Sequence, residues 1–110
     1  MHGLENRGLH LMARLERDFQ SDFLAELRSK IPREAKVFKN DAIQGYPDVS
    51  VHYRGRYILL EFKRKKGEKE QPNQRFYIEE ALQHTYATFV YPENRKEVIN
   101  EIQRTLTSME

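Results

Sequence analysis

An α-helical pattern of hydrophobic residues runs through the first third of the chain. Between residues 10 and 29, apolar side chains recur every three or four positions, which places them on one face of a helix. The apolar positions are Met12, Leu15, Phe19, Phe23 and Leu27. This pattern predicts an amphipathic helix that packs on a core and ends near Pro32.

Shorter hydrophobic runs, separated by glycine and proline, fill the rest of the chain. Gly45-Tyr46-Pro47 and Arg54-Gly55 mark turns between runs that are rich in β-forming residues. Pro72 fits the first turn of a second helix, and Asn94 is a suitable cap for a third. The predicted strands cover residues 35–39, 48–53, 56–63 and 86–91, and the predicted helices cover residues 71–84 and the segment that carries Val98, Ile99, Ile102 and Leu106. The order αβββαβα predicts an α/β fold in which helices flank a central mixed β-sheet.

The composition fits one small domain and excludes several kinds of chemistry. With 110 residues, the chain has room for a single domain over residues 1–110 with one modest core. It contains no cysteine, which excludes disulfides, thiolate catalysis, zinc ribbons and iron–sulfur clusters. The four histidines show no metal-ligating spacing, so we expect oxygen ligands for any metal. No apolar run reaches the roughly 20 residues of a bilayer span, and no signal-peptide pattern is present, so we expect a soluble, cytoplasmic protein with no membrane partner.

One predicted hairpin brings two carboxylates together. If residues 54–55 form a two-residue turn, counting back along both strands places Asp48 opposite Glu61. Because strand side chains alternate, Lys63 lies on the same face as Glu61. The opposite face is apolar and carries Val49, Val51, Ile58, Leu60 and Phe62. Two adjacent carboxylates repel each other unless a proton or cation lies between them, which predicts a site for a hard divalent ion such as Mg²⁺.

A simpler interpretation of the same hairpin remains open. A surface hairpin commonly carries a salt bridge between strands, and Glu61 could form one with Lys63 or Lys65. His52 shares the face of Asp48, but it lies near the hairpin turn, and we expect its side chain to face solvent.

The residues around this hairpin resemble a known family. Gly45-x-Pro47-Asp48 followed by Glu61-x-Lys63 resembles the PD-(D/E)xK nuclease signature. The surrounding details are similar to its VRR-NUC branch, which occurs in phage and bacterial stand-alone proteins and in the Fanconi-associated nuclease. The resemblance extends from about residue 15 to residue 90 and implies a restriction-endonuclease-like fold, of the phage or prophage type.

The resemblance also implies roles for particular residues. Asp48, Glu61 and the main-chain carbonyl of Phe62 would hold Mg²⁺ or Mn²⁺, and Lys63 would position or activate the attacking water. Further family positions are matched by Glu16 with Gln20, by Asn40 and by Gln74. Glu16 would assist metal binding, Asn40 would lie near the nucleic acid, and Gln74 would point back at the catalytic site.

Each of these three assignments has a structural alternative. Glu16 lies inside the apolar stripe of the first helix, where a carboxylate needs a partner, but it could also be a carboxylate at the edge of the stripe. Gln74 could be a buried amide that binds the backbone, because it shares a helix face with Ile78 and Ala81. Asn40 could be a turn residue that ends its strand.

Positive charge is concentrated after the hairpin. The whole chain has a net charge of +2, whereas residues 54–69 contain seven basic and two acidic residues. The basic residues of this run are Arg54, Arg56, Lys63, Arg64, Lys65, Lys66 and Lys69. Beside a hydrolytic site, residues 63–66 and Lys69 would bind the phosphate backbone without base specificity, although such runs also simply keep loops solvated.

These observations predict a Mg²⁺- or Mn²⁺-dependent endodeoxyribonuclease without an organic cofactor. The VRR-NUC resemblance implies structure-selective cutting of branched DNA, such as Holliday junctions or flaps, by a homodimer. Two alternatives remain at this stage. One is a sequence-specific restriction or homing-type endonuclease on the same fold, and the other is a DNA-binding module without catalytic activity.

Overall fold

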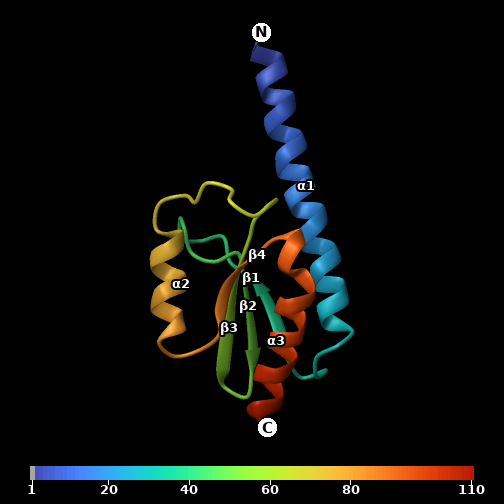
Figure 1. The fold of residues 1–110 in the computed structure, drawn as a ribbon, viewed down its shortest axis with the longest axis vertical. Helices are drawn as coiled ribbons and strands as arrows, with labels where there is room; N and C mark the ends of the chain where they lie inside the picture. The colour runs from blue at the N-terminus through green and yellow to red at the C-terminus, as the bar shows by residue number, and fades with distance from the viewer. Residues whose placement is uncertain (1) are drawn as a thin grey trace.

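The fold is a mixed α/β arrangement of four strands and three helices. The computed structural model describes residues 2–110, with side chains described at residue 11 and over residues 14–110. The elements are α1 (His2–Arg28), β1 (Lys36–Lys39), β2 (Val49–Tyr53), β3 (Arg56–Phe62), α2 (Gln74–Leu82), β4 (Ala87–Val90), the 3₁₀ turn η1 (Pro92–Asn94) and α3 (Arg95–Ser108). Figure 1 shows the helices around the sheet. The predicted order of helices and strands is confirmed.

The sheet is mixed, and its strands lie in sequence order. β1, β2 and β3 are antiparallel neighbours, whereas β4 runs parallel to β3 after the crossover through α2. Arg54 and Gly55 both have positive φ angles, 53° and 77°, as the tight two-residue hairpin turn requires. This turn pairs Tyr53 with Arg56, which confirms the predicted register.

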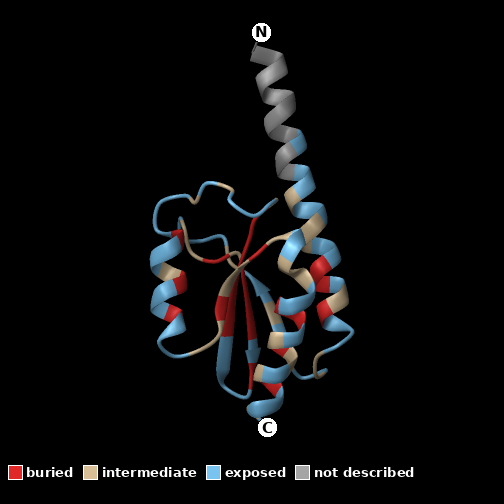
Figure 2. Cartoon of the chain, in the orientation of Figure 1, coloured by how far each residue is buried: buried red, intermediate tan, exposed pale blue. Residues whose placement is uncertain are grey.

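Helices cover both faces of the sheet (Figures 1 and 2). α1 and α3 pack on the face that carries Val49, Val51, Ile58, Leu60 and Phe62, and the inward residues predicted for the last helix are all buried there. α2 packs on the other face through a smaller apolar cluster of Leu59, Ile78, Ala81 and Ala87. The face predicted to gather charge therefore also contains a second small core under α2.

The first helix differs from its prediction in extent and in packing. It begins at His2 rather than near residue 10, and its first half extends beyond the sheet (Figure 1). Leu15 is consequently 52% exposed instead of packed, whereas Leu24, which the stripe omitted, is buried beside Phe23. The side chain of Met12 lies outside the described residues.

The second helix also begins differently from the prediction, whereas Asn94 lies at the N-cap position of the third helix as predicted. α2 starts at Gln74, and Pro72 lies before it, because Asn73 at the N-cap adopts a left-handed conformation with φ 72°. Asn94 occupies the N-cap position of α3 without a side-chain cap. Its side chain instead accepts a hydrogen bond from the Tyr91 N–H and donates one to the Phe89 carbonyl, which holds the turn η1. No helix in the described part of the chain is long and apolar enough to cross a membrane.

Candidate active site

Asp48 and Glu61 meet where β2 and β3 approach the same end of the sheet. Asp48 and Glu61 directly follow the last pair of the ladder, Val49 with Leu60, and Asp48 acts on Glu61 by its charge and by a hydrogen bond. The Phe62 N–H donates a 2.9 Å hydrogen bond to Asp48 Oδ2. Glu61 is 3% exposed. The prediction that the hairpin brings these two carboxyl groups together is therefore confirmed.

Burial and the charge of Asp48 favour the protonated form of Glu61. Burial raises the pKa of Glu61 to about 9, and the charge of Asp48 and a hydrogen bond to it act in the same direction. The charge of Lys63 opposes this shift. Glu61 therefore keeps its proton near neutral pH, at a place where a cation could relieve the same repulsion.

A buried glutamine links the lysine to the acidic pair. Lys63 Nζ donates a 2.6 Å hydrogen bond to Gln74 Oε1, and Gln74 Nε2 donates a 3.0 Å hydrogen bond to Glu61 Oε2. The Gln71 N–H donates to Gln74 Oε1 at 2.7 Å. Gln74 therefore points at the site and also binds the backbone, which combines the two interpretations of this residue. A direct Glu61–Lys63 ion pair is not among the salt bridges of the described residues.

Replacing Gln74 with alanine is expected to lower the free energy of unfolding by about 2 kcal/mol, because the buried polar groups of Glu61 and Lys63 lose their partner, as does the Gln71 N–H. Urea unfolding at pH 7 measures this change. Gln71→Ala is the matched control, because it removes an exposed amide and leaves the backbone N–H in place. Equal losses in the two variants would contradict the bridging role of Gln74.

Glu16 brings a third carboxyl group towards the pair. It is half-buried on α1, and burial, followed by the charges of Asp48 and Glu68, raises its pKa. Lys63 and Arg64 lower it. Among the side chains that the structure describes, no group of three or more carboxylate or histidine ligands is close enough to hold a metal ion. Glu16 is therefore close enough to Asp48 for its charge to be felt, as a residue that assists the acidic pair would be. Gln20, one turn further along α1, is also half-buried.

Asn40 closes the loop that leads to Asp48. Its backbone N–H donates a 2.8 Å hydrogen bond to the Asp48 carbonyl, and its side-chain amide donates a 3.1 Å hydrogen bond to the Pro47 carbonyl. These contacts match the alternative interpretation of Asn40 as a turn residue. The side chain helps to fix the backbone at Asp48 from within the protein.

Gly45 allows this loop to dock against the segment before α2. Its φ angle is 82°, and an added Cβ would lie 2.5 Å from the Pro72 carbonyl oxygen and 2.9 Å from Asn73 Cβ. Only glycine fits there, because a backbone atom cannot move aside as a flexible side chain can. The contact holds the loop that carries Asp48 beside the segment that leads to Gln74.

We expect Gly45→Ala to lower the free energy of unfolding by about 3 kcal/mol, and Gly55→Ala by only about 1 kcal/mol. Both glycines have a positive φ angle, but a Cβ at Gly55 would meet nothing within 4 Å. The difference between the two losses, measured by urea unfolding, isolates the close approach. Similar losses would show that the contact with Pro72 contributes little.

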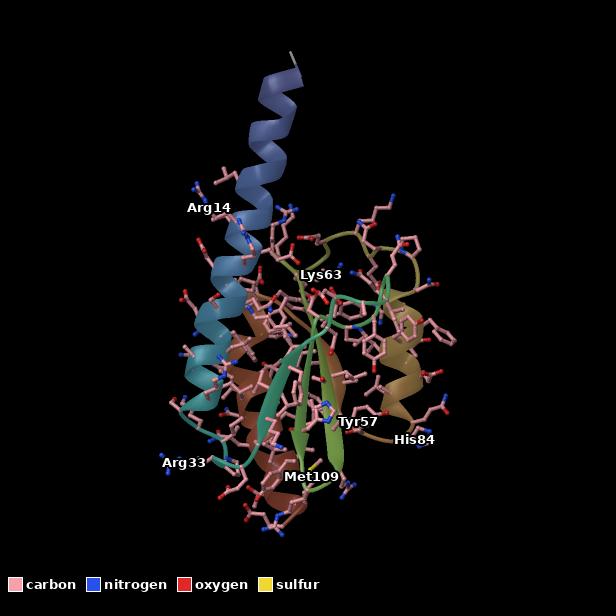
Figure 3. The ribbon with its side chains drawn as sticks, turned by 180° about the vertical axis from the view of Figure 1, so that it is seen from behind. Arg14, Arg33, Tyr57, Lys63, His84 and Met109 are labelled. Carbon is pink, nitrogen blue, oxygen red and sulfur yellow. The ribbon has the colours of Figure 1, made fainter. Side chains whose placement is uncertain are left out.

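The basic run divides between the two ends of β3. Arg54 and Arg56 lie at the hairpin, about 20 Å along the strand from Lys63 by strand geometry, so they are not beside the acidic pair. Lys65, Lys66 and Lys69 are exposed in the loop that follows β3. Figure 3 shows Lys63 at this end of the molecule and Tyr57 and Met109 towards the other. Of the residues predicted to bind the phosphate backbone, Lys65, Lys66 and Lys69 are therefore accessible, whereas Lys63 is buried.

Beside the lysine is a hollow of about 450 Å³ that the sequence did not indicate. Its lining includes Lys63, Lys65, Lys66, Arg75, Phe89 and Tyr91. Arg75 pairs with Glu70 through two 2.8 Å hydrogen bonds, and its guanidinium lies 4.8 Å from the centre of the Phe89 ring. Arg64 is held by Glu68, at 3.2 Å. The parallel pairing of Glu61 with Phe89 creates this surface, and no local pattern reveals that pairing.

The chemistry of the acidic pair fits a divalent cation. Two carboxyl groups from adjacent strands supply hard oxygen ligands, and the charge of Asp48 adds to burial in raising the pKa of Glu61. Comparison with known proteins gives no match: no family model, curated protein or solved structure matches the chain.

Proposed function

We propose that this chain is a metal-dependent endodeoxyribonuclease of the PD-(D/E)xK superfamily, with a restriction-endonuclease-like fold similar to the VRR-NUC branch. The observation that carries the proposal is the connected set of Asp48, Glu61, Gln74 and Lys63. Gln74 joins the Glu61 carboxyl group to the Lys63 ammonium group through one buried amide, and Asp48 lies beside Glu61. Such a set is suited to hydrolysis of a phosphodiester, in which water adds to phosphorus, a P–O bond of the backbone breaks and the leaving oxygen gains a proton.

The chain's own residues divide this work. Asp48, Glu61 and the main-chain carbonyl of Phe62 would hold Mg²⁺ or Mn²⁺, with Glu16 behind them. The bound ion supplies Lewis acidity and a lowered pKa for water. Lys63 donates hydrogen bonds to the attacking water or to a phosphoryl oxygen, and Gln74 holds the ammonium group in place for this contact.

The substrate proposed is branched DNA, such as a Holliday junction or a flap, cut by a homodimer. Support comes from the charges of the loop after β3, where Lys65, Lys66 and Lys69 suit contact with phosphates rather than with base edges. One protomer offers one acidic pair, so two incisions across a junction require a twofold assembly.

The proposal is tested by incubating the protein with a four-way junction, a flap and a plain duplex, each with Mg²⁺, Mn²⁺ or EDTA. We expect cleavage of the branched substrates only with a divalent ion, and no cleavage by Asp48→Asn. Asp41→Asn is the matched control, because Asp41 is exposed in the same loop.

A thermal melt supplies a second measurement for the same variants. Mn²⁺ should raise the melting temperature of the wild type and of Asp41→Asn, but not that of Asp48→Asn, because an ion bound only by the folded state stabilises it. Cleavage at fixed sequences of plain duplex would favour a restriction or homing-type enzyme. Binding without cleavage under every condition would favour an inert DNA-binding module.

A further inference from the structure

Part of the sheet face that carries the acidic pair is not covered by α2. α2 packs over β3 and β4, and β1 and β2 lie beyond it at the other edge of the sheet. Phe38, His52 and Tyr57, which we call the aromatic strip, lie on this open part. Phe38 is 48% exposed and Tyr57 is 37% exposed, although both are large aromatic residues in strands. In Figure 3 the strands of this region lie in front of α3, with α2 to one side.

The rings of the aromatic strip are in mutual contact and held in place. The centre of the His52 ring lies 5.1 Å from that of Phe38 and 6.3 Å from that of Tyr57. A 2.9 Å hydrogen bond between His52 Nε2 and Ser50 Oγ fixes the imidazole, and Ser50 is buried. Three adjacent strands thus present a continuous, ordered aromatic surface. Because its rings are already held in place, a ligand that binds there costs little conformational entropy.

One cation lies beside the aromatic strip on the same face of the sheet. Lys36 pairs with His52 across β1 and β2, so its side chain lies on the same face. On the strand residues of this face, no carboxylate occurs between the hairpin turn and the pair of Asp48 and Glu61. A protein partner that buried these rings would need no such neighbouring cation, whereas a nucleic acid strand uses both features.

The distance to the acidic pair matches a short stretch of nucleic acid. His52 is four residues from Asp48 along an extended strand, which corresponds to about 13 Å. Stacked nucleotides advance by roughly 3.4 Å each, so about four of them span this distance. A strand whose phosphate lies at Asp48 and Glu61 could therefore reach the aromatic strip.

We propose that the aromatic strip stacks unpaired bases, so that, of the branched substrates, this face serves one with a single-stranded segment beside the position of cleavage, such as a flap, and not a fully paired junction. Sheet faces with exposed aromatic side chains bind single strands in this way, because every base offers a flat surface for stacking. In paired DNA the bases are covered by their neighbours and cannot stack on a protein ring. The inference rests on the proposed nuclease function for its use in cleavage, but the binding it describes occurs without cleavage.

The test measures binding of a fluorescent oligothymidine of about 12 nucleotides by the full chain in EDTA, where hydrolysis does not occur. We expect Phe38→Leu and Tyr57→Leu each to weaken binding about tenfold. Phe38→Tyr and Tyr57→Phe should bind like the wild type, because they keep a ring. Phe76→Leu is the matched control, since Phe76 is 58% exposed on α2, outside the aromatic strip.

Several outcomes would overturn the inference. Unchanged binding in both leucine variants would exclude stacking, as would an equal loss in Phe76→Leu. A change in sedimentation without a change in oligothymidine binding would instead identify the aromatic strip as a surface between protein copies. Ring-dependent binding by a protein that cleaves nothing would keep this inference and end the nuclease proposal. If the leucine variants cleave flaps as the wild type does, the nuclease proposal stands and this inference fails.

Discussion

Replacing Lys63 with alanine is expected to slow DNA cleavage by about 10²–10⁴-fold and to change DNA affinity only a few-fold. Lys63 is 5% exposed, and Gln74 holds its ammonium group beside Glu61. A buried cation contributes little to capture of the DNA backbone, which the exposed lysines of the next loop can bind. Its effect should instead fall on the reacting phosphate, where charge develops. Single-turnover cleavage and binding in EDTA measure the two quantities separately.

Two further variants make this result interpretable. Lys65→Ala removes an exposed lysine from the adjacent loop, and it should weaken binding slightly with little change in the cleavage step. Lys63→Met keeps most of the side-chain volume, so inactivity in a variant that melts like the wild type reflects the lost ammonium group rather than a cavity. A fully active Lys63→Ala variant would remove lysine from the mechanism.

Glu61→Gln is expected to stabilise the metal-free chain by about 3 kcal/mol at pH 8, although it removes a proposed metal ligand. The pKa of Glu61 is raised from 4.5 to about 9 in the folded chain. Between these values the unfolded state has lost a proton that the folded state keeps. The free energy of unfolding therefore falls as pH rises from about 5 to 9, by at most about 1.4 kcal/mol per pH unit. Glutamine has no proton to lose and can accept the same hydrogen bond from Gln74.

The measurement is urea unfolding in EDTA from pH 5 to pH 9. The advantage of Glu61→Gln should be small at pH 5 and grow steadily towards pH 9. Glu79→Gln, on the exposed side of α2, is the control and should show no such growth. A difference that does not depend on pH would show that the acidic pair does not hold a proton.

The hairpin and its acidic pair could be predicted from sequence because their geometry is local. Arg54 and Gly55 fix a two-residue turn, and that turn determines which residues face each other along both strands. The alternation of side chains then separates Glu61 from the apolar residues that α1 and α3 bury. Each step depends only on neighbouring residues and on the pleat of a strand.

The remaining features depend on contacts between distant segments. Leu15 follows the helical period of α1 but lies where the sheet no longer provides a surface, so periodicity alone assigned it to the core. Pro72 fits a helix start by type, yet the approach of Gly45 and the left-handed Asn73 place it before α2. Arg75 and Phe89 come together only because β4 runs parallel to β3. None of these relations leaves a repeating pattern along the chain.

The contact between Gly45 and Pro72 also restricts how this protein can diverge. Two segments that are separated along the chain meet through backbone atoms, so the length of each is set by the other. An inserted residue on one side would shift the glycine away from its partner and move Asp48 relative to Gln74. Insertions and deletions in these segments are therefore expected to be inherited as compensating pairs.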